Sequence, residues 1–332
     1  MKKRMFTYIL NLAVLLCVLF FSAPSASAVS TDTMQQWLQE YPMEECSCTY
    51  TDENKANHDA SVYFSPALLF QDSSILSPDM AKASMALSAT AYNPSSVNSL
   101  LRKLDFQLYS NTESYDKNRN GLTLEDCDYA AYTIGYREVT HPETQEPCII
   151  YCVPIQGTYA GLEWISDFNV GDGQDHEGFR KASEEIYNDL LARIADDGYD
   201  AEHRIIWLAG HSRGGACANL IAGWFTKNGT GVVRQENLFA YTFASPAVSK
   251  NADATLTNIF NFVNPGDLVP MLPMPEWGYG RYGQTFELDS DTLSYANFAT
   301  RFAEINGKAY RGSLTGEEYR PVLSALANTE MA

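Results

Sequence analysis

The sequence has few basic side chains. It holds 23 lysines and arginines against 41 aspartates and glutamates, which gives a formal net charge of −18 over 332 residues. Proteins that bind nucleic acid neutralise its phosphates with clusters of cations, and anionic lipid surfaces also attract positive charge. The composition therefore excludes nucleic acid as a partner and excludes electrostatic docking on anionic lipid. The composition does not exclude binding to an uncharged lipid or ester surface.

Long apolar runs are absent after the N-terminus, so no internal segment is expected to cross a bilayer. The one such run, Phe6–Phe21, follows the cations of residues 2–4 and precedes the small residues Ala26–Ala28. This order predicts a secretory signal peptide over residues 1–28, cleaved near Ala28, and the short run favours cleavage over a retained anchor. Cleavage leaves 304 residues and removes three positive charges, so the formal charge goes from −18 to −21. We predict a secreted, extracellular chain with one large core.

Metal-binding patterns are incomplete. Asp116–Gly121 matches the first half of a calcium loop, but Cys127 stands where the bidentate glutamate belongs, so an ordinary Asn-Gly turn is favoured. Cys46 and Cys48 lack a second pair of ligands nearby, which argues against zinc. We therefore predict no metal and no cofactor.

The cysteines left after cleavage are even in number, which permits disulfides in an exported protein without fixing their connectivity. Cys148 and Cys152 are not expected to bridge each other, because on one strand they would lie about 13 Å apart. Cys217 is expected to be small core filler. The full set is Cys46, Cys48, Cys127, Cys148, Cys152 and Cys217.

Apolar strands alternate with helices along most of the chain. Residues 29–126 are predicted to form a mainly helical, looped N-terminal region, whose helix over residues 79–92 is assigned to the core domain of residues 127–332. Such alternation predicts an α/β fold with a mostly parallel central sheet and helices on both faces. In these sheets the chemistry gathers at the carboxyl ends of the strands. Strands are expected at 128–139, 147–155, 204–208, 238–243 and 258–263, and helices at 79–92, 97–104, 177–194 and 214–225.

The strongest motif is the G-x-S-x-G made by Gly210, Ser212 and Gly214. It lies between the predicted strand 204–208 and the predicted helix 214–225, which is the order that a nucleophile elbow needs. A Cβ at 210 or 214 would clash in so sharp a turn. Ser212 would lie at a helix N-terminus, which favours developing negative charge. The structural alternative is a serine in an ordinary loop between strand and helix.

Two further segments follow other predicted strands. Gly157 and Thr158 come directly after residues 147–155, where a glycine and a short hydroxyl side chain suit an oxyanion hole. Asp167 is placed to hold Thr158 in orientation. Asp267 follows residues 258–263, in the order serine then aspartate that α/β hydrolases use, and would orient a histidine. The structural alternatives are an ordinary turn at 157–158 and an Asx turn at Asp267.

Six motifs together resemble a known family, the class 3 lipases, which are fungal-lipase-like α/β hydrolases, here in a secreted bacterial form. The resemblance runs from about residue 77 to residue 283, with the motifs in the family's order. They are IQGT at 155–158, WISDF at 164–168, HEGF at 176–179, GHSRGG at 210–215, FASPAV at 243–248 and NPGDLVPMLP at 264–273.

The resemblance implies an α/β-hydrolase fold and gives the matching residues their roles. Ser212 would be the nucleophile and Asp267 the triad acid, with Thr158 and the backbone of Arg213 as the oxyanion hole. Trp164 would belong to a lid region, and His176 would be structural or adjacent to the site. The implied substrate is an acylglycerol or related carboxylic ester, with peripheral contact at a lipid interface and no protein partner.

Histidine is scarce, and none follows Asp267, where the family places the triad base. The five histidines are His58, His141, His176, His203 and His211. One explanation is that residues 277–283 and a predicted helix at 295–305 are an insertion, and that the sequence stops at Ala332 before the last strand and the histidine. The other is that the base is lost, or that His176 is recruited. We predict a serine ester hydrolase acting through an acyl-enzyme, with a non-catalytic α/β-hydrolase-fold binding protein as the alternative.

Overall fold

A seven-stranded sheet forms the centre of the computed structural model, which describes residues 29–51, 56–109, 115, 129–158, 171–229, 231–264, 267, 269–273 and 277–288. The predicted signal peptide, the turn at 116–121, Trp164, Asp167 and the predicted helix at 295–305 lie outside these residues. The strands follow the order β3-β4-β5-β6-β7-β8-β9. Their bounds are β3 Gln107–Leu108, β4 Gly135–Thr140, β5 Pro147–Ile155, β6 Arg204–His211, β7 Leu238–Phe243, β8 Ile259–Val263 and β9 Gln284–Glu287.

The sheet is parallel from β5 to β9, and β3 and β4 extend it with antiparallel pairing. The strands expected at 147–155 and 238–243 have those bounds in β5 and β7. The strand expected at 128–139 was placed too early, since β4 begins at Gly135 and Tyr132 makes only an isolated bridge to Ile155. The carboxyl ends of β5, β6, β7 and β8 therefore meet at one edge, called the carboxyl edge below.

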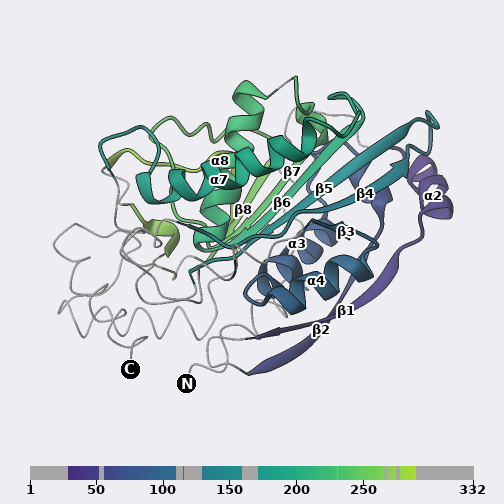
Figure 1. Ribbon diagram of the computed structural model, residues 1–332, viewed down its shortest axis with the longest axis horizontal. Helices are drawn as coiled ribbons and strands as arrows, with labels where there is room; N and C mark the ends of the chain where they lie inside the picture. The colour runs from purple at the N-terminus through teal and green to yellow at the C-terminus, as the bar shows by residue number, and fades with distance from the viewer. Residues whose placement is uncertain are drawn as a thin grey trace.

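Helices cover both faces of the sheet (Figure 1). α7 (Glu177–Ile194) and α8 (Arg213–Asn228) pack on one face, and α3 (Pro78–Thr90) and α4 (Pro94–Lys103) on the other. The alternation of β5 explains why both faces are needed: Ile150 and Cys152 join the core on the α3 side, whereas Tyr151 and Val153 join the core on the α7 side. This is the predicted mostly parallel sheet with helices on both faces, the architecture of α/β hydrolases.

The prediction of a mainly helical N-terminal region was wrong in part. After α2 (Thr31–Glu40), β1 (Glu44–Thr51) and β2 (Asn57–Phe64) form a two-stranded antiparallel sheet against α3 and α4. In β1 the residues Cys46, Cys48 and Tyr50 are buried and those between them are exposed. That period of two is a strand signal, and it was masked by polar residues on the exposed face.

α3 is joined to the centre of the sheet. It begins at Pro78 with Ser77 as its N-cap, and it packs against β6 and β7. The Trp207 indole of β6 donates a 2.8 Å hydrogen bond to the Ser84 hydroxyl of α3, and both groups are buried. The N-terminal helices thus share a core with the sheet.

All the cysteines that the structure describes are buried, and no disulfide joins any two of them; they are Cys46, Cys48, Cys148, Cys152 and Cys217. Cys217 has no exposed surface, as expected for core filler. Burial raises the pKa of the Cys48 and Cys148 thiols to about 11, so both are protonated at neutral pH. Within the described part of the chain, no helix is both long and apolar enough to cross a membrane.

Candidate active site

Ser212 lies at a sharp turn between β6 and α8, in the predicted order of strand, serine and helix. Its backbone has φ 56° and ψ −125°, a conformation that side-chain-bearing residues seldom adopt and that costs about 1–3 kcal/mol. The turn is held by the Ser212 amide, which donates a 2.8 Å hydrogen bond to the Phe243 carbonyl at the end of β7. The fold therefore holds Ser212 in a strained turn at the carboxyl edge.

The two motif glycines allow backbones to touch beneath this turn. A Cβ on Gly210 would overlap the Gly214 carbonyl and come within 2.7 Å of the Gly215 amide nitrogen. A Cβ on Gly214 would lie 2.8 Å from the carbonyl oxygen of Gln156 and would overlap the Ile155 carbonyl. Only glycine fits either position, for the steric reason that the sequence suggested.

The end of β5 lies beside the elbow, because Ile155 is level with Gly210 in the parallel register. Gly157 is needed there for close approach: a Cβ would lie 2.7 Å from the His211 carbonyl and would overlap the Tyr92 hydroxyl. Thr158 follows Gly157 directly in the chain. Asp167, expected to orient Thr158, lies outside the described residues.

Tyr92 is a site-adjacent residue that the sequence gave no signal for. Its hydroxyl lies 2.9 Å from His211 Nδ1, and its carbonyl accepts a 3.3 Å hydrogen bond from the Gln156 side chain. Burial lowers the pKa of His211 to about 4, so its imidazole is neutral at pH 7. Tyr92 thus joins the elbow to the loop after β5, although it lies 119 residues before His211.

Arg213 is the first residue of α8 and follows Ser212 directly. Helix N-terminal amides and the helix dipole favour negative charge, which suits the expected oxyanion role of this backbone. The Arg213 guanidinium is buried, and Nη2 donates a 3.3 Å hydrogen bond to the Gly178 carbonyl in the first turn of α7. The N-termini of α7 and α8 are therefore packed together.

His176 is the N-cap residue of α7 and has no exposed surface. Its ring stacks on Phe179 with centroids 4.0 Å apart, and its amide donates to the Val248 carbonyl. A wholly buried, stacked imidazole is poorly placed to exchange protons with a substrate. The HEGF segment instead fixes the start of α7 against the loop that follows β7.

Asp267 comes after β8, at the same edge as Ser212. Its Oδ1 accepts a 2.9 Å hydrogen bond from the Val269 amide, which is the Asx-turn geometry named above as the structural alternative. Neighbouring strands lie about 4.8 Å apart, and β7 separates β6 from β8, so the two strand ends are about 10 Å apart. A side chain that reaches both Ser212 and Asp267 must bridge that interval.

Three of the other histidines lie away from this edge. His58 is on β2, and His141 follows β4 and packs edge-on against Phe70 at 4.9 Å. His203 precedes β6 and contacts Glu146 and Asp200 at the opposite end of the sheet. None of the three occupies the interval between Ser212 and Asp267.

The structure places a strand within the region that was expected to be an insertion, between residues 277–283 and the predicted helix at 295–305. β9 begins at Gln284, immediately after residues 277–283, and pairs in parallel with β8, with Phe286 level with Phe262. β9 is short and only every second residue is half-buried, so its sequence pattern is weak. The Leu288 amide bonds to the Val263 carbonyl, so the chain leaves β9 at the carboxyl edge.

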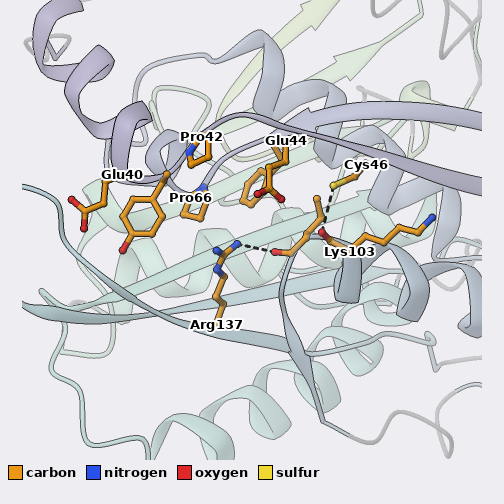
Figure 2. Close-up of a pocket in the computed structure, with 10 residues that line it drawn as sticks. Glu40, Pro42, Glu44, Cys46, Pro66, Lys103 and Arg137 are labelled. Carbon is orange, nitrogen blue, oxygen red and sulfur yellow. Dashed lines mark hydrogen bonds between the residues drawn. The ribbon is translucent and has the colours of Figure 1, made fainter.

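A separate pocket of about 250 Å³ lies among the link from α2 to β1, the end of α4 and β4 (Figure 2). Its two cations are already engaged: Lys103 Nζ donates to the Ser47 carbonyl at 2.7 Å, and Arg137 Nη1 donates to the Leu104 carbonyl at 2.9 Å. The lining residues belong to other elements than those that hold Ser212 and Asp267. The pocket is therefore distinct from the candidate active site.

Comparison with known proteins gives one family. Residues 152–277 match the family model described as Lipase (class 3). A curated lipase of Rhizomucor miehei is 29% identical over 150 residues, which make up 41% of this chain and 41% of that protein. The chain thus spans about two fifths of the length of this relative.

Solved lipase structures show weaker likeness. A lipase from Rhizopus microsporus var. chinensis has 20% identity and a TM-score of 0.45, over 66% of this chain and 77% of that one. A triacylglycerol lipase with a serine protease triad as its catalytic centre has 21% identity and a TM-score of 0.43, over 64% and 81%. The family match itself runs from β5 through the elbow and Asp267 to Trp277, and over this stretch the chain is similar to the class 3 lipases.

Proposed function

We propose that this chain is a secreted serine hydrolase of lipase type, which cleaves the carboxylic ester of an acylglycerol or a related lipid. The observation that carries the proposal is the strained backbone of Ser212 between β6 and the N-terminus of α8. The family match supports the choice of an ester as substrate. The formal charge of −18 favours an uncharged ester surface over an anionic one.

In the proposed mechanism, Ser212 Oγ attacks the ester carbonyl and the alcohol leaves, which forms an acyl-enzyme. The backbone amide of Arg213 and the amide and hydroxyl of Thr158 stabilise the oxyanion, because β5 and β6 end side by side. Water then releases the fatty acid. Asp267 holds and charge-balances an imidazole between β6 and β8. No step calls for a metal or a cofactor.

The general base decides between this proposal and its alternative. A serine hydroxyl has a pKa far above 7 and is a poor nucleophile without a base, and no histidine follows Asp267 in the sequence. That observation favours the second candidate, a binding protein with the same fold that holds an ester without cleaving it. The first candidate requires an imidazole in the interval between Ser212 and Asp267, and the chain leaves β9 at this same edge, where the Leu288 amide bonds to the Val263 carbonyl.

A fluorophosphonate probe separates the two functions. The chain is expressed through to its natural stop codon and labelled beside Ser212→Ala and Asp267→Asn. The hydrolase proposal expects wild-type labelling that is lost in Ser212→Ala and slowed about 10⁴-fold in Asp267→Asn. A folded wild-type chain that is not labelled supports the binding protein. Hydrolysis of short and long acyl esters then defines the substrate.

Export and contact with lipid are part of the proposal. N-terminal sequencing of the protein from the culture medium is expected to begin just after Ala28. Intact protein that stays in the membrane fraction would contradict cleavage. Sedimentation with vesicles of uncharged lipid tests peripheral contact.

A further inference from the structure

One buried guanidinium links the segments that flank the candidate site. Arg281, between the loop of Asp267 and β9, donates from Nη1 to the Ser245 carbonyl at 3.1 Å and to the Pro270 carbonyl at 2.6 Å. Ser245 follows β7, and Pro270 lies in the short helical turn Val269–Met271 that follows Asp267. A single nitrogen therefore bridges two loops of the carboxyl edge.

The loop after β7 is in turn joined to the nucleophile. The Phe243 carbonyl accepts from the Ser212 amide, and a Cβ added to Gly215 would lie 3.1 Å from the Ser245 Cβ. Ala244, between these two contacts, has a left-handed φ of 49°. We therefore expect a displacement of Ser245 to shift the first turn of α8 and Ser212.

The loop of Asp267 is joined to the same place by a second bond. The Leu272 carbonyl accepts a 2.6 Å hydrogen bond from the Ala247 amide, and the Leu272 amide donates to the Val269 carbonyl. The Asp267 carboxylate bonds to the Val269 amide. Arg281 and the Ala247–Leu272 bond thus both link these loops by hydrogen bonds.

Stability alone does not account for an arginine here. Among the described residues, Arg281 Nε is buried without a hydrogen-bond partner. A buried cation that is incompletely bonded costs free energy, and an apolar side chain of similar volume is often as stable or more so. Two carbonyls from different loops, however, can be held at a fixed separation by a rigid guanidinium and not by an apolar side chain.

We propose that Arg281 is a positioning residue for the ester hydrolysis, which sets the separation between the Ser212 elbow and the loop that carries Asp267. This rests on the proposed function. Arg281 acts through the Ser245 and Pro270 carbonyls and does not contact the reacting atoms. Loss of its bonds lets the two loops move apart while the substrate surface stays intact.

The test compares Arg281→Met and Arg281→Lys with Arg234→Met, which removes an exposed arginine at the other end of the sheet. On a soluble ester, kcat is expected to fall about 100-fold in Arg281→Met with KM changed less than about twofold, because displacement of catalytic groups by about 1 Å costs that much. Arg281→Lys keeps the charge and can reach one carbonyl, so it should recover part of the rate. Arg234→Met should match wild type. Equal kcat in Arg281→Met and wild type overturns the proposal.

Hydrogen exchange measures the same movement of the two loops and does not depend on enzymatic activity. The amides of Ala247, Val248 and Leu272 are expected to exchange faster in Arg281→Met than in wild type or Arg234→Met. If the methionine variant does not fold, Arg281→Lys takes its place in this measurement. Unchanged exchange in both variants refutes the positioning role. If wild type neither hydrolyses esters nor reacts with the probe, the proposed function fails, and exchange at these amides still decides whether Arg281 couples the loops.

Discussion

The two ends of β6 hold their side chains in opposite ways. At the amino end, Arg204 is buried and forms an ion pair with Asp197, with Nε and Nη2 donating at 2.8 and 2.6 Å. Nη1 donates to the Val232 carbonyl, and Nη2 donates to the Tyr199 carbonyl as well. At the carboxyl end, Ser212 has a strained backbone and lies over glycines whose backbones touch. One end holds paired charges and the other holds strain.

This difference separates what stabilises the sheet from what serves its chemistry. Ser212 and Ala244 are two of the non-glycine residues with positive φ in the described chain, and both follow neighbouring strands at the carboxyl edge. Strain of this kind persists only where the surroundings hold it, and it gathers at functional sites. We therefore infer that the buried ion pair at the amino end of β6 offsets part of the free energy that the strained backbone at the carboxyl edge costs. The predictions below test that division, from the largest expected effect to the smallest.

Asp197→Ala should cause the largest loss of stability. The Arg204 and Asp197 side chains are only 4% and 3% exposed, so removal of the carboxylate leaves a buried charge unpaired. The free energy of unfolding in urea is expected to fall by about 3–5 kcal/mol. The exposed pair of Arg234 and Glu202 is the control, and Glu202→Ala should cost less than about 1 kcal/mol. Equal losses in the two variants would contradict the division.

Gly210→Ala should damage the carboxyl end. Its Cβ would meet the Gly214 and Gly215 backbones, so the elbow must shift, at a cost of about 3 kcal/mol in the free energy of unfolding. The probe should no longer label Ser212. Gly231→Ala is the matched control, because a Cβ there meets nothing within 4 Å. Normal labelling of Gly210→Ala would show that the elbow tolerates a side chain.

Tyr92→Phe should have a smaller effect, confined to the site. It removes the hydroxyl 2.9 Å from His211 Nδ1, and the lost bond is worth about 1 kcal/mol. The rate of labelling at Ser212 should fall, because the loops after β5 and β6 lose a common contact. Tyr136→Phe, whose hydroxyl donates to Gln107 on the exposed side of the sheet, should leave that rate unchanged. A slower rate in both variants would point to a general loss of packing.

The histidines at the two ends of β6 should respond to pH in opposite directions. Bonds to Glu146 and Asp200 raise the pKa of His203 above 6.5, so its contribution is complete below pH 6.5 and is lost as pH rises through the raised value. Burial lowers the pKa of His211 to about 4, so the unfolded chain takes up a proton first and stability falls between pH 6.5 and about 4.

Urea unfolding of His203→Gln and His211→Gln across pH 4–9 measures both effects. Relative to wild type, His203→Gln should lose stability below pH 6.5, and the loss should shrink at higher pH. His211→Gln should gain relative stability as the pH falls from 6.5 toward 4. The same pH dependence of stability in both variants would contradict the contrast between the two ends of β6.

The sequence alone predicted the parts of the fold with long apolar patterns. The bounds of β5, α7 and β7 agree with the predicted ranges, because Pro147–Ile155 and Leu238–Phe243 are almost continuously buried and Glu177–Ile194 has an apolar stripe. The elbow was predictable because its strand, glycines and helix are contiguous. Local patterns suffice where the structure is local.

The remaining parts depend on contacts that a local pattern does not record. β9 has four residues of alternating exposure, and only its pairing with β8 makes it a strand. The bond between Tyr92 and His211 and the bridge from Arg281 to Ser245 and Pro270 join segments far apart in the chain. No spacing rule predicts them, so the supporting contacts of the site came only from the structure.

The bond between Ser84 and Trp207 has a consequence for the order in which this protein folds. Its partners are 123 residues apart, so α3 leaves the ribosome long before the strand that it covers exists. Until β6 is made, the apolar side chains of α3, among them Met80 and Leu87, have only the small sheet of β1 and β2 to pack on and lack the central strands that bury them in the folded protein. Folds built on such distant contacts form slowly, and they expose apolar surface until those contacts are made. The N-terminal third of the chain is therefore the part most in need of protection from aggregation during synthesis.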